Sequence, residues 1–480
     1  MCSLGSSNLG LNPAVVAHQS NTIHSHAAML NGIAAEIGQT GQASRAPGLF
    51  GLLPGNLIMT GGSILLAQSA EADVRAAAAS ATDLLGRLSA VIAEQEAASS
   101  AGDGYSTGAM SAAKASDLYN QVMTNPDALD GMTPDAVKRW FEGLTPAQQD
   151  AFVNGRPEIA GNTNGIPFDR RIEANVLNAQ QELANGATGD QKDYLEKVVA
   201  GEVKLISYSP DDNRIIEMVG EYYPENVEVD GVVVHPRTDD IINYVPGTNA
   251  DMEGFYKEET QDLARAIVDG ANPPGATVAF VYKDSPFPTF NPLTGVAKND
   301  WSESVGGAYH EFNNALALEN TGGAPVTSIE HSFGSSAGGN AEIRGSNFEN
   351  RIVLAGIGMT DDWTANKDTT YYSFTGQSDI IRAARDVQVD GLGYGIPPTS
   401  ENGFNEIDTG FAPAPTRWNV PDVSVGTPWG DIEIPVDVSV PDPIGNFNDR
   451  MDQHSRITRT NEENQVNVDK MLAIIEKSGR

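Results

Sequence analysis

Apolar positions follow two different periods along the chain, and the change between them falls near residue 200. Before it, apolar residues recur at the three- and four-residue spacing of helices. After it, short runs rich in Val, Ile and Tyr alternate with helical stretches, which predicts an α/β fold with a mostly parallel sheet and helices on both faces. The pattern predicts strands at 203–207, 214–219, 241–245, 278–282, 326–330, 352–355 and 371–375, and helices at 252–269, 300–318 and 461–477.

Residues 1–115 are rich in Ala, Ser and Gly and predict an α-helical hairpin. Helical spacing covers about 12–38 and 65–99, with a Pro/Gly-rich turn between them. Alanine-rich faces suit close helix packing, so this region either packs on its neighbour or docks a helical partner protein or a second copy. The stretch 46–70 carries no charge, but Pro47, Pro54 and several glycines make it a poor helix, so we expect no membrane span.

Two further regions follow the hairpin. Residues 116–200 are predicted to form a helical connector or cap, with helices at 168–186 and 189–200. Thr133 and Thr145 each precede a proline there, a combination typical of helix starts. The α/β domain is predicted to span 201–480, with an irregular Pro/Gly-rich excursion at 391–445 that is long enough for a lid.

The charge balance limits the partners of this chain. It has 64 acidic against 30 basic residues and a formal net charge of −34, which argues against nucleic acid and against anionic membrane surfaces. Cys2 is the one cysteine, so no intramolecular disulfide can form. No basic cluster followed by an apolar core occurs near the N-terminus, so we expect no signal peptide and a cytoplasmic location, with export by a non-standard route as the alternative.

The strongest chemical signal lies where the apolar run from Val326 ends. It reads Glu330-His331-Ser332-Phe333-Gly334 and continues in very small residues. A strand, a sharp turn and a helix of this kind present a nucleophilic serine, because the strained turn exposes the hydroxyl and the helix N-terminus faces the oxyanion. The pattern Gly-x-Ser-x-Gly has its second glycine at Gly334, whereas Glu330 occupies the first glycine position. We therefore predict Ser332 as the nucleophile of an elbow with one defect.

Chain order predicts the histidine of a catalytic triad, because in this sheet type the order is Ser, acid, His. Of the seven histidines, only His454 follows the serine; His331 directly precedes it, and we expect its side chain to point elsewhere because its backbone is part of the turn. His454, in a polar stretch before the last helix, is the predicted base, expected in a loop. A surface histidine is the structural alternative.

The acid should follow a strand after the elbow. Asp379, in the turn after the strand at 371–375, is the predicted choice, and it would orient His454 and stabilise its imidazolium. Its structural alternative is an aspartate at a helix start. Asp361 or Asp362, after the preceding strand, is the other candidate acid.

The oxyanion hole is predicted from main-chain N–H groups, one at Phe333 and one at Thr248 or Asn249 in the loop after the strand at 241–245. The alternation of side chains along a strand does not fix the direction of Glu330, because the elbow interrupts it. If the Glu330 side chain points into the site, its charge would oppose an oxyanion. No Gly-x-Gly-x-x-Gly loop and no Cys/His cluster with metal spacing occurs, so neither a cofactor nor a metal is expected.

The connector and the elbow together resemble a known family. The residues that carry the resemblance are Trp140, Leu144, Gln148, Pro157-x-Ile159-x-Gly161-x-x-x-Gly165-Ile166-Pro167, Arg171 and Asn175, followed by the elbow. This pattern is similar to an actinobacterial family of α/β-hydrolase domains of mostly unassigned function, whose elbow usually reads Gly-His-Ser-Tyr-Gly-Ser. The resemblance covers roughly 135–475 and implies an α/β-hydrolase fold. The hairpin at 1–115 loosely resembles the helical-hairpin proteins exported by type VII secretion, although their Trp-x-Gly turn is absent.

The sequence thus predicts a serine hydrolase that cleaves an ester or related acyl bond of a small-molecule or lipid-like substrate. A thioesterase and a peptidase would share the same triad. The alternative hypothesis is a catalytically weak or inactive hydrolase-fold scaffold, whose hairpin mediates protein–protein interaction or export; Glu330 motivates it.

Overall fold

The chain divides into two compact units, residues 1–108 and 109–480. In the computed structural model, the described residues are 110–229, 232–289, 299–384, 394–411, 417–419, 423–427, 430–434, 439–441 and 443–478. They all belong to the second unit, so the helical hairpin predicted at 1–115 lies almost entirely outside them. None of the helices in these ranges combines the length and the apolar character needed to cross a bilayer.

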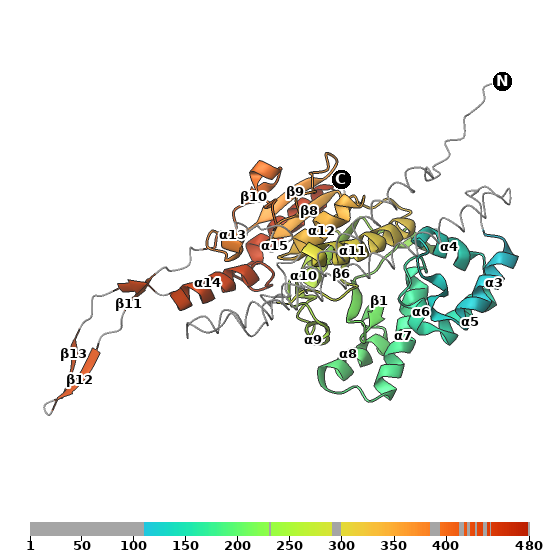
Figure 1. The fold of residues 1–480 in the computed structure, drawn as a ribbon, viewed down its shortest axis with the longest axis horizontal. Helices are drawn as coiled ribbons and strands as arrows, with labels where there is room; N and C mark the ends of the chain where they lie inside the picture. Colours follow the sequence, from blue (N-terminus) through green and yellow to red (C-terminus); the bar gives the residue numbers. More distant parts are fainter. Residues whose placement is uncertain are drawn as a thin grey trace, which may run out of the picture. The chain divides into compact units, whose positions relative to one another are not determined.

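An eight-stranded sheet forms the centre of the described unit (Figure 1). Its strands are β1 (Lys204–Ser209), β2 (Arg214–Val219), β5 (Asp240–Val245), β6 (Thr277–Lys283), β7 (Val326–His331), β8 (Asn350–Leu354), β9 (Thr370–Phe374) and β10 (Asn405–Ile407). Their order is β1-β2-β6-β5-β7-β8-β9-β10, and within this sheet β2 alone runs against the others. All of the predicted strands are present, and the predicted α/β-hydrolase fold class is confirmed.

Strand β6 shows why the sheet is covered on both faces. Its residues are buried throughout, and alternate side chains point to opposite faces. Phe280 and Tyr282 join one apolar core with α11 (Asn299–Glu319) and α12 (Gly334–Ile343). Ala279 and Val281 join another core with α10 (Asp262–Gly270) and α15 (Gln465–Ser478). The sheet is therefore the middle layer of three (Figure 1).

A helical cluster precedes the sheet. It consists of α3 (Ala112–Val122), η1 (Pro126–Leu129), α4 (Pro134–Glu142), α5 (Pro146–Gly155) and α6 (Pro157–Ala160), and its own apolar core is built around Trp140. Both predicted helix starts have the expected caps, since Thr133 accepts a hydrogen bond from Ala136 N and Thr145 forms a capping box with Gln148. Helices α7 (Phe168–Ala184) and α8 (Gly189–Ala200) then lead to β1.

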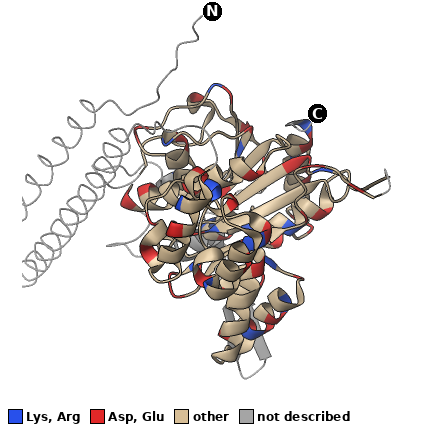
Figure 2. Cartoon of the chain, turned by 90° about the vertical axis from the view of Figure 1, so that its right-hand side faces the viewer, with Lys and Arg blue, Asp and Glu red and all other residues tan. Residues whose placement is uncertain are grey.

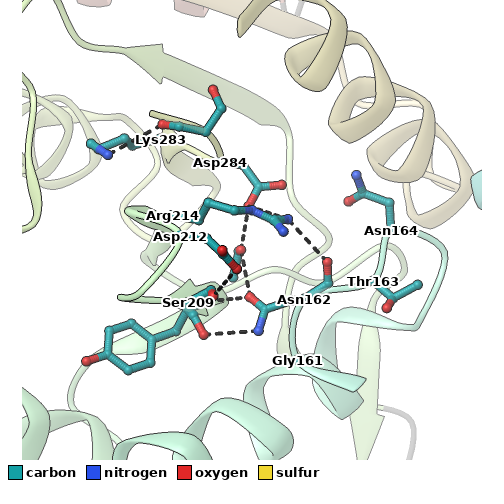
Figure 3. A network of polar contacts seen from close by, with 12 residues as sticks. Gly161, Asn162, Thr163, Asn164, Ser209, Asp212, Arg214, Lys283 and Asp284 are labelled. Carbon is teal, nitrogen blue, oxygen red and sulfur yellow. Dashed lines mark hydrogen bonds and ion pairs between the residues drawn. The ribbon is translucent and has the colours of Figure 1, made fainter. Parts of the chain in front are cut away.

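Polar side chains join this helical cluster to the edge of the sheet (Figure 3). Asn162 accepts hydrogen bonds from the N–H of Tyr208 at 2.7 Å and from the hydroxyl of Ser207 at 2.9 Å, both on β1. On α7, Asn175 donates to the carbonyls of Gly161 at 2.9 Å and Leu205 at 3.0 Å. Two residues that carry the family resemblance, Gly161 and Asn175, thus fasten the connector to β1.

Several elements differ from the sequence expectation. The helix predicted at 252–269 is two helices, α9 (Met252–Tyr256) and α10, separated at Glu258, whose φ is +63°.

The remaining elements are the hairpin β3 (Val227–Val229) and β4 (Val232–His235), α13 (Ile381–Ala384), η2 (Ser400–Asn402), β11 (Arg417–Asn419) with β14 (Ser439–Pro441), β12 (Val423–Thr427) with β13 (Gly430–Ile434), and α14 (Pro443–Arg456). The excursion predicted as irregular at 391–445 therefore contains short strands, one of which, β10, extends the main sheet.

Replacing Gly161 by alanine is expected to weaken the joint between connector and sheet. The backbone there has a φ of −73°, which alanine adopts freely, but the new Cβ would overlap the Asn175 side chain. Overpacking costs about 1–3 kcal/mol, so we expect the free energy of unfolding in urea to fall by that amount. Gly307→Ala is the control, because its Cβ would lie 3.5 Å from Arg344 and alanine favours a helix interior. Equal urea midpoints for the two variants would contradict this account of the joint.

Candidate active site

Ser332 lies in the sharp turn between β7 and α12, at the carboxyl end of a central strand. Its φ is +52°, a left-handed conformation that costs a non-glycine residue about 1–3 kcal/mol and persists only where surrounding contacts impose it. Its N–H donates to the carbonyl of Leu354 at 2.9 Å, and its own carbonyl accepts from the hydroxyl of Ser335 at 2.8 Å. The predicted strand, turn and helix are thus formed, with the serine at the strained position.

Two glycines allow this turn to lie against the end of β5. A Cβ at Gly334 would come 2.5 Å from the carbonyl oxygen of Val245. A Cβ at Gly247 would come 2.9 Å from both Ser332 Cβ and His331 Nδ1. The second glycine of the elbow motif is therefore required for close backbone approach, and Gly247, in the loop after β5, lies against His331 and Ser332 from the other side.

His454 lies between Ser332 and Asp379. Its Nε2 is 2.9 Å from Ser332 Oγ, and its Nδ1 is 2.9 Å from Asp379 Oδ1. An ionised carboxylate only accepts hydrogen bonds, so Nδ1 carries the proton and Nε2 is free to accept from the serine hydroxyl. The three residues are buried, with Asp379 at 0 % and His454 at 6 % exposure. The structure thus brings the predicted nucleophile, base and acid into one hydrogen-bonded chain.

Asp379 occupies the turn after β9, and its Oδ1 also accepts from the N–H of Ile381 at 2.9 Å. The helix-start role and the contact with His454 therefore coexist in one carboxylate. The alternative acids Asp361 and Asp362 are both exposed, and both ring nitrogens of His454 are engaged by Ser332 and Asp379. Of the three candidate acids, Asp379 is the one whose carboxylate contacts His454.

The position of His454 differs from the sequence expectation in one respect. It lies in the last turn of α14, whereas we predicted a polar loop. The polar residues next to it in the sequence include Asp452, which is half-buried, and Ser455, which is exposed; Asp452 pairs with Arg456 one turn later. A polar stretch of this kind is typical of a solvated helix face as well as of a loop, and here the helix forms.

The main-chain donors next to Ser332 differ in their availability. Among the described residues, no acceptor is found for the N–H of Phe333 or of Thr248. The N–H of Asn249, in contrast, donates to the carbonyl of Pro288 at 2.9 Å, so it is not free to bind an oxyanion. Of the two donors that the sequence left open in this loop, Thr248 is the one that the geometry leaves available.

Ser332 opens into a cavity of about 430 Å³. The residues that line it are Thr248, His331, Ser332, Met451, Asp452, His454 and Ser455. Thr248 also lines a neighbouring cavity of about 510 Å³, formed chiefly by the loop after β5 and by α9. Contrary to the expectation that it points elsewhere, His331 therefore faces the site. In the described part of the chain, no group of three or more His, Cys, Asp or Glu side chains is arranged to bind a metal.

Glu330, in the first glycine position of the motif, is fully buried and paired with Arg351. Arg351 Nη2 lies 2.6 Å from Glu330 Oε2 and Nε lies 2.9 Å from Oε1, while the Ser328 hydroxyl donates to Oε1 at 2.7 Å. The carboxylate fills the space next to Gly338 of α12, where a Cβ would overlap it. Glu330 is absent from the described lining of the Ser332 cavity. Its charge is neutralised beneath the helix and does not face the place of an oxyanion.

Arg351 connects Glu330 to a second carboxylate. Its Nη1 lies 2.5 Å from Glu342 Oε2, and Glu342 also accepts from Trp363 Nε1 at 2.6 Å and from the Tyr371 hydroxyl at 2.9 Å. Burial alone would lower the pKa of Arg351, but the carboxylates of Glu330 and Glu342 raise it above its ordinary value. Sequence reasoning missed this partner. The sequence shows an arginine next to the apolar run at 352–355 but does not indicate its partner; in the structure Arg351 lies in the buried strand β8, directly across from Ser328 of β7.

Comparison with known proteins gives distant matches. No family model matches the chain. Two uncharacterised proteins, from the CDC 1551 and H37Rv strains of Mycobacterium tuberculosis, are each 25% identical over 262 residues, which is 47% of this chain and 39% of theirs. The chain thus spans about two fifths of the length of these relatives.

Among solved structures, two hydrolases are similar at low scores. A dienelactone hydrolase-like promiscuous phosphotriesterase from metagenomic libraries has a TM-score of 0.26 and 13% identity, covering 57% of this chain and 98% of its own. Esterase 2 of Thermogutta terrifontis, phosphorylated by paraoxon, has a TM-score of 0.25 and 9% identity, covering 43% of this chain and 80% of its own.

Replacing Arg351 by methionine is expected to destabilise the protein strongly. The substitution leaves Glu330 and Glu342 buried without a cation, and removing one partner of a buried pair costs about 3–5 kcal/mol. We expect urea unfolding to show this loss, and Glu330→Gln added to Arg351→Met to recover part of it. Arg344→Met, at an exposed arginine without an ion pair among the described residues, is the control and should cost far less. A stability loss no larger than that of the control would rule out the buried pair as a structural requirement.

Proposed function

We propose that this protein is a serine hydrolase that cleaves an ester or related acyl bond through an acyl-enzyme. The observation that carries the proposal is the hydrogen-bonded chain from Ser332 through His454 to Asp379, with the serine held in a left-handed turn at the start of a helix. This arrangement of nucleophile, base and orienting acid is the general requirement for activating a serine hydroxyl.

In the first half of the proposed reaction, Ser332 Oγ attacks the carbonyl carbon of the substrate as His454 Nε2 removes the hydroxyl proton. The resulting tetrahedral intermediate collapses when the carbon–oxygen bond to the leaving group breaks, and His454 returns the proton to the leaving oxygen. In the second half, His454 takes a proton from water, the hydroxide attacks the acyl carbon, and the bond to Ser332 Oγ breaks. Oγ regains the proton from His454, and a carboxylic acid is released.

Asp379 has two roles in this scheme. Its hydrogen bond to Nδ1 keeps the histidine in the tautomer that accepts from the serine, and its charge stabilises the imidazolium that forms in each half-reaction. The carboxylate is fully buried, so its interaction with the imidazolium is less screened than a surface pair would be.

The negative charge that develops on the substrate oxygen would be bound by the N–H groups of Phe333 and Thr248. Both lack an acceptor among the described residues, and α12 begins directly after Phe333, so its positive end lies next to the elbow. The paired Glu330 does not oppose this charge, which removes the observation that motivated an inactive scaffold.

The surroundings of Ser332 support a small-molecule acyl substrate. Cavities of about 430 and 510 Å³ are within the size range of small-molecule sites. The leaving group must meet His454, so it would occupy the side lined by Met451, Asp452 and Ser455. Acidic residues are spread over the helices and loops around the sheet, as Figure 2 shows, so an uncharged or cationic substrate would approach more readily than an anion.

A fluorophosphonate probe is expected to label the purified protein once, on Ser332. The probe reacts with serines whose hydroxyl is activated by a base, so Ser332→Ala should abolish labelling. Ser455→Ala is the matched control, because Ser455 lines the same cavity but is exposed and belongs to α14. In-gel fluorescence and mass spectrometry of the labelled peptide read out the result. Persistent labelling of folded Ser332→Ala would refute the assignment of the nucleophile.

Substitutions in the chain of three residues are expected to act as one unit. With a p-nitrophenyl ester, Asp379→Asn should lower kcat by about 10⁴-fold, because the wrong tautomer of His454 is favoured. Ser332→Ala and the double variant Ser332→Ala/His454→Ala should have the same residual rate, since neither retains a nucleophile–base pair. Steady-state kinetics measure these rates. A further large loss in the double variant would mean that His454 acts independently of Ser332.

A further inference from the structure

Each of the three proposed catalytic residues is preceded by a residue that takes part in a second set of contacts between the same turns and helix. His331 precedes Ser332, Gln453 precedes His454, and Ser378 precedes Asp379. His331 reaches the main chain of His454, and Gln453 reaches the main chain of Ser378. The mechanism above gives these contacts no role.

His331 Nε2 lies 3.2 Å from the carbonyl oxygen of His454. A carbonyl accepts hydrogen bonds only, so Nε2 of His331 must carry the proton. The two imidazole rings lie 5.1 Å apart between centroids and are tilted by 39°. Burial, followed by the neighbouring His454, lowers the pKa of His331 to about 3, so the ring is neutral at ordinary pH and is too weak a base to take the proton of Ser332. Close packing against Gly247 fixes the other edge of the ring.

Gln453 provides the second contact. Its Oε1 accepts from the N–H of Ser378 at 3.2 Å, and the residue is buried, with 3 % exposure. A Cβ at Gly376 would come 2.9 Å from the same Oε1, so the acid-bearing turn closes directly over the amide. One turn earlier in α14, the carbonyl of Arg450 accepts from Ile380 N at 3.4 Å. Helix α14 is therefore attached to the turn that carries Asp379.

The position of α14 explains why such attachments are needed. The strand before it, β14, pairs with β11 and is not part of the eight-stranded sheet. Helix α14 therefore does not follow directly from a strand of that sheet, which could otherwise fix its direction. Nevertheless His454 must place both ring nitrogens within 2.9 Å of their partners. Catalytic groups must be held within about 0.5 Å of productive geometry, so contacts of α14 with the elbow and the acid turn have to supply this precision.

We propose that His331 and Gln453 are positioning residues that dock the end of α14 between the nucleophile elbow and the acid turn. Their hydrogen bonds lie beside those of Ser332, His454 and Asp379. They bind main-chain groups of His454 and Ser378 and so fix the backbone from which His454 and Asp379 extend. The inference rests on the proposed function for its kinetic consequence, whereas docking of α14 itself can be measured without turnover.

The kinetic test compares His331→Leu with His331→Gln. Leucine removes the N–H donor, so we expect kcat to fall about 10- to 100-fold with little change in KM, as for a small misplacement of a catalytic group. Glutamine offers an amide N–H at similar reach and should restore kcat to within about threefold, since hydrogen bonding rather than ring shape is what is required. His310→Leu, on α11 and bonded to Ser346, is the control and should keep the wild-type kcat.

Hydrogen–deuterium exchange on the same proteins measures docking directly. Amides of residues 443–456 should exchange faster in His331→Leu and in Gln453→Leu than in wild type or His331→Gln, while α11 remains protected in all of them. Unchanged exchange of α14 in His331→Leu would overturn the proposal, and so would a kcat loss that glutamine fails to restore. If wild type turns over no ester, the proposed function fails, and the exchange comparison still decides whether His331 and Gln453 dock α14.

Discussion

The strained turn at Ser332 is the constraint on which the rest of the site depends. Hydrogen bonds to Leu354, Ser335 and Ile357 hold Ser332 in its left-handed conformation. Without such contacts the strained turn would relax. The small residues after the serine follow from the same constraint, since α12 must begin against the end of β5. The presentation of the hydroxyl to the cavity, the start of the helix and the position of the Phe333 N–H are then consequences of a single backbone conformation.

Glu330 shows that the elbow motif reflects a steric requirement, which residues other than glycine can meet in a suitable environment. A glycine at this position leaves room between the turn and its helix, and here the room is taken by a carboxylate that Gly338 accommodates from the opposite side. The carboxylate is tolerated because Arg351 and Ser328 satisfy it, and because Glu342 completes the environment of the arginine. A buried ion pair beneath the turn of Ser332 thus replaces the usual small residue, and the Ser332 hydroxyl keeps its contact with His454.

Much of this architecture could be predicted from the sequence, for identifiable reasons. Strands such as β5 and β6 are buried on both faces, so their apolar runs are continuous and easily read. Chain order indicated His454, and the position after the strand at 371–375 indicated Asp379; the fold brings the two together across 75 positions. The strands β10 to β14 were missed because runs of three to five residues are too short to show a period.

What could not be predicted depends on contacts between distant segments. Nothing local indicates that Arg351 neutralises Glu330 or that Pro288 occupies the N–H of Asn249. The helix under His454 and the inward direction of His331 likewise follow from how α14 docks. Pairings of this kind are set by tertiary packing, on which local pattern carries no information.

The central claim is that Ser332 carries the acyl group during turnover. We would mix the protein rapidly with a p-nitrophenyl ester, quench within the first turnover, and locate added mass by peptide mass spectrometry. The account predicts a burst of about one equivalent of p-nitrophenol and an acyl adduct on the peptide that contains Ser332. Turnover without any adduct on that peptide, or an adduct on another residue, would contradict it.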